Sequence, residues 1–190
     1  ITNTGTVTNS GSFGIVTNTS GTFTNSGTTG DWTNDATLIN NGTLGNGTNS
    51  GTMAMTAGSV GSVNNSGSFD LSGGTTGAIT NSGTVTYSGG SIDSIDNSGT
   101  YDVTAGGNTI NHNSYTQGSS GNTIMDGTQA FTVSGPATLG GTLTINNAPT
   151  AFGRYTMLTG SSISGTYATL TPTPSSNSYL KYGDTTVKLY

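Results

Sequence analysis

The sequence contains no cysteine and no glutamate, and only 6% of its 190 residues are charged. Without cysteine, disulfides and thiolate metal sites are excluded. Long helices are not expected, because glutamate, lysine and arginine normally fill their exposed faces. No apolar run approaches the roughly 20 residues of a membrane-spanning helix. We therefore expect no disulfide-stapled domain, no helical bundle and no direct insertion of this segment into a membrane.

Basic residues are equally scarce. Arg154, Lys181 and Lys188 are the three cations, and the net charge is −5. Three scattered cations do not make the phosphate-neutralising patch of a nucleic-acid-binding protein, so no nucleic-acid partner is expected. The surface must be built from threonine, serine, asparagine and glycine, which favours an extracellular location. The chain opens at Ile1 rather than methionine, which indicates a processed or trimmed chain.

What the sequence does have is a repeat with a step of 16 residues, as in 81 − 65 for two of its asparagines. The motifs "VNNSGSF", "ITNSGTV" and "IDNSGTY" begin at Val63, Ile79 and Ile95. Other positions keep the same step, which is the signature of a repeat protein. They are Asn49, Asn65, Asn81 and Asn97; Met53, Phe69, Val85 and Tyr101; Met55, Leu71, Tyr87 and Val103; and Val60 and Ile92, interrupted by Thr76.

Apolar residues alternate with polar ones inside each unit, which is strand periodicity. Asparagine and glycine are expected at the corners, because both tolerate the left-handed backbone region. The sequence therefore predicts an all-β protein, a parallel β-solenoid with coils of about 16 residues stacked ~4.8 Å apart. The apolar columns should form interior ladders, and the asparagines an amide ladder at one corner. A three-stranded, right-handed coil is favoured, with a flattened two-sided coil as the alternative.

The first part of the chain uses the same step with two asparagines in each coil. Its columns are Val7, Phe23 and Ile39; Asn9, Asn25 and Asn41; Val16 and Trp32; and Asn18 and Asn34. From Ile39 to Met53 the spacing is 14 residues (53 − 39), which predicts one shortened coil.

The period fades after Tyr101. We divide the chain into regular repeats (1–109), irregular coils (110–136) and a β-rich C-terminal cap (137–190). The expected inward residues beyond the repeats are Ile110, Tyr115, Ile124, Leu139, Leu143 and Ile145. Prolines suit loops at the edge of a sheet because they cannot donate to its ladder, and Pro149, Pro172 and Pro174 are placed there.

The C-terminal segment reads "LGGTLTI", "GRYTMLTG", "SGTYATL", a proline-containing loop and "YLKYGDTTVKLY". It resembles the C-terminal end of autotransporter (type V secretion) passenger domains over residues 137–190. The resemblance implies that the segment closes a β-helix on a bacterial cell surface and leads through a linker to an outer-membrane barrel. Here the sequence stops at Tyr190, so a released passenger, a trimmed chain and a distinct secreted protein are all open. No comparable cap precedes "ITNTGTV", and that end is predicted to pair with another subunit or an upstream segment.

Candidate chemistry is sparse. His112 has no second histidine or cysteine with which to bind a metal and is interpreted as a loop residue. Asp93, Asp96 and Asp102 are the densest acids and are interpreted as solvated corner residues; a glycosidase would need two of them as paired carboxylates. The calcium-binding nonapeptide pattern is absent, and the glycine pairs do not precede helices, as a phosphate site requires. We predict no catalytic, cofactor or metal-binding residue and no enzyme activity.

The favoured function is a surface adhesin, stalk or self-associating structure, with a secreted subunit that polymerises end to end as the alternative. Self-association and a surface glycan or host-cell ligand are the expected partners. A polysaccharide-acting enzyme and an ice-binding solenoid are weaker alternatives. The ice-binding hypothesis depends on outward threonine pairs, which other residues interrupt. The outward pairs are expected to be Thr6/Thr8, Thr22/Thr24, Leu38/Asn40, Ser68/Asp70, Thr84/Thr86 and Thr100/Asp102.

Overall fold

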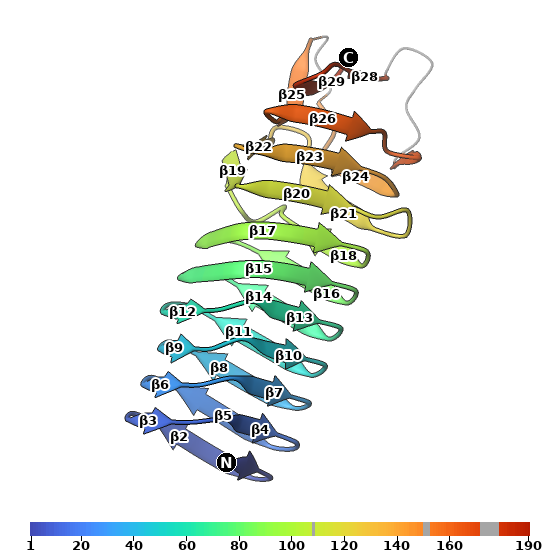
Figure 1. Cartoon of the computed structure of the whole chain (residues 1–190). Coiled ribbons are helices and arrows are strands. Elements are labelled where there is room, and N and C mark those ends of the chain that lie inside the picture. The colour runs from blue at the N-terminus through green and yellow to red at the C-terminus, as the bar shows by residue number, and fades with distance from the viewer. Residues whose placement is uncertain (108, 150–152, 172–178) are drawn as a thin grey trace.

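The computed structural model describes residues 1–107, 109–149, 153–171 and 179–190. These residues form strands β1 to β29 and no helix. Successive coils pair through parallel strands, and Figure 1 shows them stacked into a rod with the two ends of the chain at opposite ends. The predicted all-β solenoid of about 16-residue coils is confirmed.

The strands have the following bounds: β1 (Thr2–Asn3), β2 (Thr6–Asn9), β3 (Ser12–Phe13), β4 (Val16–Asn18), β5 (Thr22–Asn25), β6 (Thr28–Thr29), β7 (Trp32–Asn34), β8 (Thr37–Asn40), β9 (Thr43–Leu44), β10 (Gly47–Asn49), β11 (Thr52–Met55), β12 (Ser59–Val60), β13 (Val63–Asn65), β14 (Ser68–Leu71), β15 (Thr75–Asn81), β16 (Thr84–Tyr87), β17 (Ser91–Asn97), β18 (Thr100–Asp102), β19 (Thr109–His112), β20 (Ser114–Gln117), β21 (Asn122–Asp126), β22 (Ala130–Val133), β23 (Pro136–Leu139), β24 (Thr142–Asn146), β25 (Tyr155–Thr159), β26 (Ser162–Gly165), β27 (Thr169–Thr171), β28 (Leu180–Tyr182) and β29 (Thr186–Leu189).

Three sheets run along the rod. Sheet A has 14 strands, from β1, β3 and β4 up to β26, and sheet B has 10 strands, from β2 to β27. Up to β18 each coil contributes to these two sheets alone, because β15 and β17 each span the places of two short strands in earlier coils. The coils up to β14 have three strands each, as favoured, but two of the three belong to sheet A, so the coil has two faces, as in the flattened alternative. Sheet C, with strands β19, β22, β25, β29 and β28, begins only afterwards.

The predicted columns are the observed registers. Met53, Phe69, Val85 and Tyr101 pair in turn on sheet B, and all four side chains are fully buried. The other predicted columns also hold: Val63–Ile79–Ile95, Met55–Leu71–Tyr87 and Val60–Thr76–Ile92. Val103, the last expected member of the Met55 column, is buried and follows β18. The core of the solenoid is thus made of like residues stacked along the axis.

The register predicted around Ile39 was wrong. Phe23 pairs with Leu38, and Leu38 with Met53, so two consecutive coils have 15 residues each (38 − 23 and 53 − 38). A shift of one residue moves a strand's side chains to the opposite face. Leu38 is therefore fully buried, and Ile39 lies on the outer side where Leu38 had been expected.

The same correction applies to the second asparagine column. Asn25 pairs with Asn40 rather than Asn41, and the Asn25 amide donates to Asn40 Oδ1 at 2.8 Å. Asn40 is fully buried, so the Leu38/Asn40 pair faces inward. After Asn40 this column becomes apolar, since its next member is Met55. Periodicity alone could not separate Leu38 from Ile39, because both are adjacent apolar residues.

A buried amide ladder runs through the coils. Each asparagine donates from Nδ2 to Oδ1 of the asparagine in the next coil, at 2.6–2.8 Å over six steps. Its members are Asn3, Asn18, Asn34, Asn49, Asn65, Asn81 and Asn97. Each Nδ2 up to Asn81 also donates to a backbone carbonyl of the next coil, as Asn65 does to Thr84 at 2.9 Å. The ladder thus satisfies buried amides that would otherwise be costly.

The reason expected for asparagine and glycine at the corners was wrong in part. Among the described residues, Asn147 is the one non-glycine residue with a positive φ, of 49°. The ladder asparagines are strand residues instead. The glycine of "NSG" is required by space: a Cβ on Gly83 would lie 2.2 Å from the Gly67 carbonyl oxygen of the coil before. Close stacking of the corners, rather than a left-handed backbone, therefore selects glycine there.

Beyond Asn97 the coils widen. The step is 20 residues from Ile95 to Tyr115 (115 − 95) and 22 from Tyr115 to Ala137 (137 − 115). Among the inward residues expected here, Ile124 is wrong: its neighbours on β21 are buried, and it is half-buried on the other face. The other five are buried: Ile110, Tyr115, Leu139, Leu143 and Ile145.

Sheet C ends in an antiparallel hairpin. β29 pairs antiparallel with both β25 and β28, unlike every coil-to-coil pairing before it. Pro149 lies in the loop after β24, as expected. Pro172 and Pro174 lie outside the described residues.

Candidate functional site

The acids singled out in the sequence are not brought together as a catalytic pair. Asp96 lies on β17 of sheet A and Asp102 on β18 of sheet B, so the two belong to different sheets. The three acids had been predicted at corners but lie in strands, Asp93 and Asp96 on β17 and Asp102 at the end of β18; Asp93 and Asp96 are exposed to solvent, as expected. Asp102 Oδ1 accepts hydrogen bonds from the backbone N–H and the hydroxyl of Thr104, at 3.0 and 2.7 Å. Asp96 and Asp102 therefore do not face one bond, as the paired carboxylates of a glycosidase do.

His112 is not a loop residue but the last residue of β19, and it is 3% exposed. Its Nδ1–H donates to the Ile92 carbonyl at 3.0 Å, and Nε2 accepts from the Tyr101 hydroxyl at 2.7 Å. Burial lowers the pKa of His112 to about 4. The imidazole is therefore neutral at physiological pH, with both nitrogens occupied. In this state it is a structural link between coils rather than a free base.

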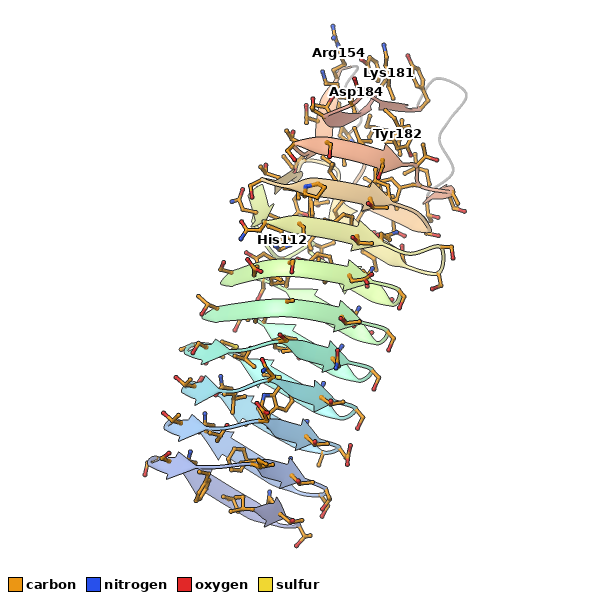
Figure 2. All side chains as sticks on the ribbon, in the orientation of Figure 1. His112, Arg154, Lys181, Tyr182 and Asp184 are labelled. Carbon is orange, nitrogen blue, oxygen red and sulfur yellow. The ribbon has the colours of Figure 1, made fainter. Side chains whose placement is uncertain are left out.

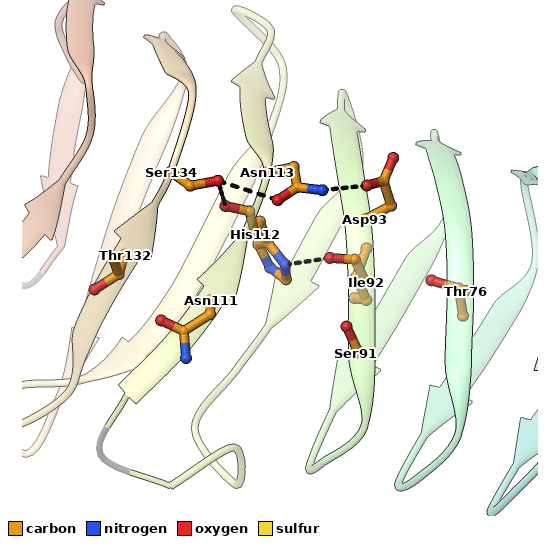
Figure 3. Close-up of a pocket in the computed structure, with 9 residues that line it drawn as sticks. All are labelled: Thr76, Ser91, Ile92, Asp93, Asn111, His112, Asn113, Thr132 and Ser134. Carbon is orange, nitrogen blue, oxygen red and sulfur yellow. Dashed lines mark hydrogen bonds between the residues drawn. The ribbon is translucent and has the colours of Figure 1, made fainter.

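A cleft of about 320 Å³ lies beside His112, where the coil first widens and sheet C begins (Figure 3). Its lining comes from β15, from the start of β17, and from β19 and β22 with the residues that follow them. The lining residues are Thr76, Ser91, Ile92, Asp93, Asn111, His112, Asn113, Thr132 and Ser134. The cleft exists because β19 pairs with β22 and not with β17, which leaves the first half of β17 without a strand on that side.

A row of polar side chains holds one rim of the cleft in place. Ser134 Oγ donates to Asn113 Oδ1 at 3.0 Å, and Asn113 Nδ2 donates to Asp93 Oδ1 at 2.5 Å. The backbone N–H of Asn113 also donates to the Asp93 carbonyl at 2.7 Å. Figure 3 shows these residues side by side across three coils. The amide of Asn113 is thus used at both ends, and one oxygen of Asp93 is left for other partners.

Thr76 lies at the inner end of the cleft. It is 6% exposed, and among the described residues its hydroxyl is the one buried side-chain polar atom without a hydrogen-bond partner. In Figure 3 this hydroxyl is turned from β15 toward β17. Its column neighbours, Val60 and Ile92, are apolar. A buried hydroxyl without a partner costs stability, so its presence in this column needs a reason.

The three cations gather at the C-terminal end of the rod, although they are scattered in the sequence. Lys181 and Lys188 are cross-strand neighbours on β28 and β29. The Arg154 guanidinium lies 5.8 Å from the centre of the Tyr190 ring, which stacks on Tyr179 at 5.1 Å. Figure 2 shows Arg154 and Lys181 at this end, far from His112.

Two features of the sequence coincide with the cleft, although neither was predicted to mark a site. Thr76 interrupts an otherwise apolar column, and the repeat step lengthens after Asn97.

Within residues 1–107, 109–149, 153–171 and 179–190, no three side chains of histidine, cysteine or acid type cluster as a metal would need. The same residues include no helix long and apolar enough to cross a membrane.

Comparisons with known proteins add no relative: no protein-family model, curated protein or solved structure matches this chain.

Proposed function

We propose that this chain is a non-enzymatic structural rod of the bacterial cell exterior, which holds an adhesive or spacing surface away from the cell. The observation that supports this best is one outer column of sheet B. It carries a hydroxyl residue on nine of the ten strands, and asparagine on the other. The column is Thr6, Thr22, Thr37, Thr52, Ser68, Thr84, Thr100, Asn122, Thr142 and Thr169.

A neutral column suits a stacked rod because any charge would be repeated every ~4.8 Å along the axis and would repel its neighbours. Nine steps of that spacing give sheet B a length of roughly 45 Å. The buried amide ladder links the seven successive coils from Asn3 to Asn97, which favours stiffness in this part of the rod. The likeness of residues 137–190 to autotransporter passenger ends supports placing the rod on a bacterial surface, and the scarcity of charge is in keeping with export.

The proposal is tested with purified protein and with cells. Light scattering after gel filtration should give the mass of one chain or of a small lateral assembly. Antibodies against the chain should label intact cells of the organism that encodes it. Labelling only after the cells are permeabilised would overturn the proposed location, and hydrolysis of a polysaccharide by the purified chain would overturn the non-enzymatic role.

A second candidate is a subunit that polymerises end to end. The first coil favours it, because among the described residues β1, β2 and β3 each pair with a strand on one side only. Ile1 and Ile15 in this coil are 48% and 69% exposed. Open strand edges with apolar neighbours promote association, and either another copy of the chain or a preceding segment of the same protein would cover them. Filaments whose mass grows with protein concentration would select this candidate over a discrete rod.

The ice-binding alternative is not favoured. The second outer column of sheet B begins with Thr8 and Thr24 but continues with Ile39, Ala54 and Asp70. A flat surface of threonine pairs is therefore broken after two coils.

A further inference from the structure

We propose that the cleft between β17 and β19 binds one unit of a neutral sugar. This goes beyond the structural role above and does not depend on where the rod is located. Its volume, about 320 Å³, is at the lower end of the roughly 300–1,000 Å³ typical of small-molecule sites. The position of the cleft is also distinctive, since it lies where sheet C, beginning with β19, joins the two-sided coil.

The lining offers hydrogen-bonding groups that the protein does not use. The side chains of Ser91, Asn111 and Thr132 have no hydrogen-bond partner among the described residues, and one oxygen of Asp93 is free. Hydroxyls, an amide and a carboxylate together can donate to and accept from neighbouring hydroxyl groups. A sugar matches this mixture of groups, because each of its hydroxyls can both donate and accept a hydrogen bond.

The charge of the cleft excludes an anionic ligand. Asp93 is its one carboxylate, and His112 is neutral because burial lowers its pKa to about 4. The three cations of the chain lie in or beside the C-terminal strands, outside the lining. A phosphate or uronate would therefore meet a like charge with no cation to bind it. A neutral sugar meets no such barrier, and Asp93 can accept a charge-assisted hydrogen bond from one of its hydroxyls.

Thr76 also indicates a ligand in the cleft, independently of the volume and charge of the cleft. Valine has the same shape and would match its column neighbours, yet the chain keeps a buried hydroxyl without a partner at the inner end of the cleft. Such groups are rare in folded proteins and often mark a site for a ligand or an ordered water. This hydroxyl hydrogen-bonds to the bound sugar, directly or through one water that lies between the two.

The rim is preorganised for binding. Asn113 is fixed by Ser134 on one side and Asp93 on the other, so the carboxylate does not have to be ordered when a ligand arrives. Asp93 lies on β17, and Asn113 and Ser134 lie in short bends between strands of the next two coils, so all three are held beside rigid elements. Less entropy is therefore lost on binding.

The test is a titration of the isotopically labelled full chain, followed by amide NMR, with glucose, galactose, mannose and N-acetylglucosamine. Shifts should be confined to residue 76 and residues 91–93, 111–113 and 132–134, with at least one sugar saturating below about 100 mM, as a single sugar unit with millimolar affinity would. Galacturonate and calcium chloride serve as comparison ligands and should leave these amides unchanged. A response to either of these, or to no sugar at all, would overturn the proposal.

Two variants decide whether the named groups are responsible. Asp93→Asn keeps the size and the acceptor for Asn113 but removes the charge, and should weaken the affinity by about tenfold or more. Asp96→Asn removes a charge from the same strand outside the lining and is the matched control. Thr76→Val should abolish or weaken binding while the fold persists. Equal affinity in all three variants and the parent would contradict the assignment, whether or not a sugar binds elsewhere on the rod.

Discussion

The amide ladder can be tested by replacing one of its members with alanine. Asn65 donates to Asn81 Oδ1 at 2.8 Å and to the Thr84 carbonyl at 2.9 Å, and it accepts from Asn49 Nδ2 at 2.8 Å. Each of these hydrogen bonds contributes about 1 kcal/mol net, so their loss costs about 3 kcal/mol. Asn81 Oδ1 is then left buried without this donor, which adds about 1–3 kcal/mol. Asn65→Ala should therefore lower the free energy of unfolding by about 4–6 kcal/mol in all.

Asn64 provides the matched control, because it is the preceding residue on β13, faces outward and is exposed. Asn64→Ala should change the free energy of unfolding by less than about 0.5 kcal/mol, as surface substitutions usually do. Urea unfolding followed by the fluorescence of Trp32, the single tryptophan and 2% exposed, measures both variants. If the two substitutions cost the same, the ladder does not stabilise the solenoid and the reasoning is refuted.

Three further predictions concern glycine, pH and the buried hydroxyl. Gly83→Ala should lower the free energy of unfolding by about 1 kcal/mol or more, as overpacking a core does, because its Cβ would meet the Gly67 carbonyl oxygen. Gly5→Ala is the control and should be harmless, because a Cβ there would have nothing within 4 Å. Equal urea midpoints for the two variants would contradict this. The pKa of His112 is 6.5 unfolded and about 4 folded, so the unfolded state binds more protons between these values. The free energy of unfolding should therefore fall by about 3 kcal/mol as the pH drops from 6.5 to about 4. His112→Phe should remove this pH dependence. If the pH dependence persists in that variant, His112 is not its cause. Thr76→Val should raise the free energy of unfolding by about 1 kcal/mol in the absence of ligand, and a loss of stability in urea would show that the hydroxyl has a partner in the coil.

The repeat made most of the architecture predictable. Columns such as Phe69, Val85 and Tyr101 are apolar residues at a constant step, and one stacked coil is the simplest structure that buries them all together. Where two neighbouring residues are both apolar, as at Leu38 and Ile39, the pattern does not say which faces inward. There the backbone register decides, and the Asn25–Asn40 hydrogen bond fixes it.

The position of the cleft was harder to predict, for a different reason. It depends on β19 pairing with β22 in sheet C rather than with β17 in sheet A, and the repeat pattern does not indicate this choice of partner. His112 illustrates the same limit, because a single histidine after the repeats has no pattern that reveals its burial. Thr76 interrupts an apolar column of the sequence, but only the structure shows that its hydroxyl is unpartnered and lies beside a cleft.

Engineered cysteine pairs test the stacking of the coils most directly, since the chain has no cysteine of its own. Thr84 and Thr100 are register partners on adjacent strands, and a spacing of ~4.8 Å lies within the range of Cα separations that a disulfide spans. Thr84→Cys combined with Thr100→Cys should form an intramolecular disulfide under mild oxidation, detected as a loss of free thiols while the protein stays monomeric. Ser68→Cys with Thr100→Cys, two coils apart at roughly 10 Å, should remain reduced. Equal oxidation of the two pairs, or of neither, would contradict a solenoid in which residues sixteen apart lie on top of one another.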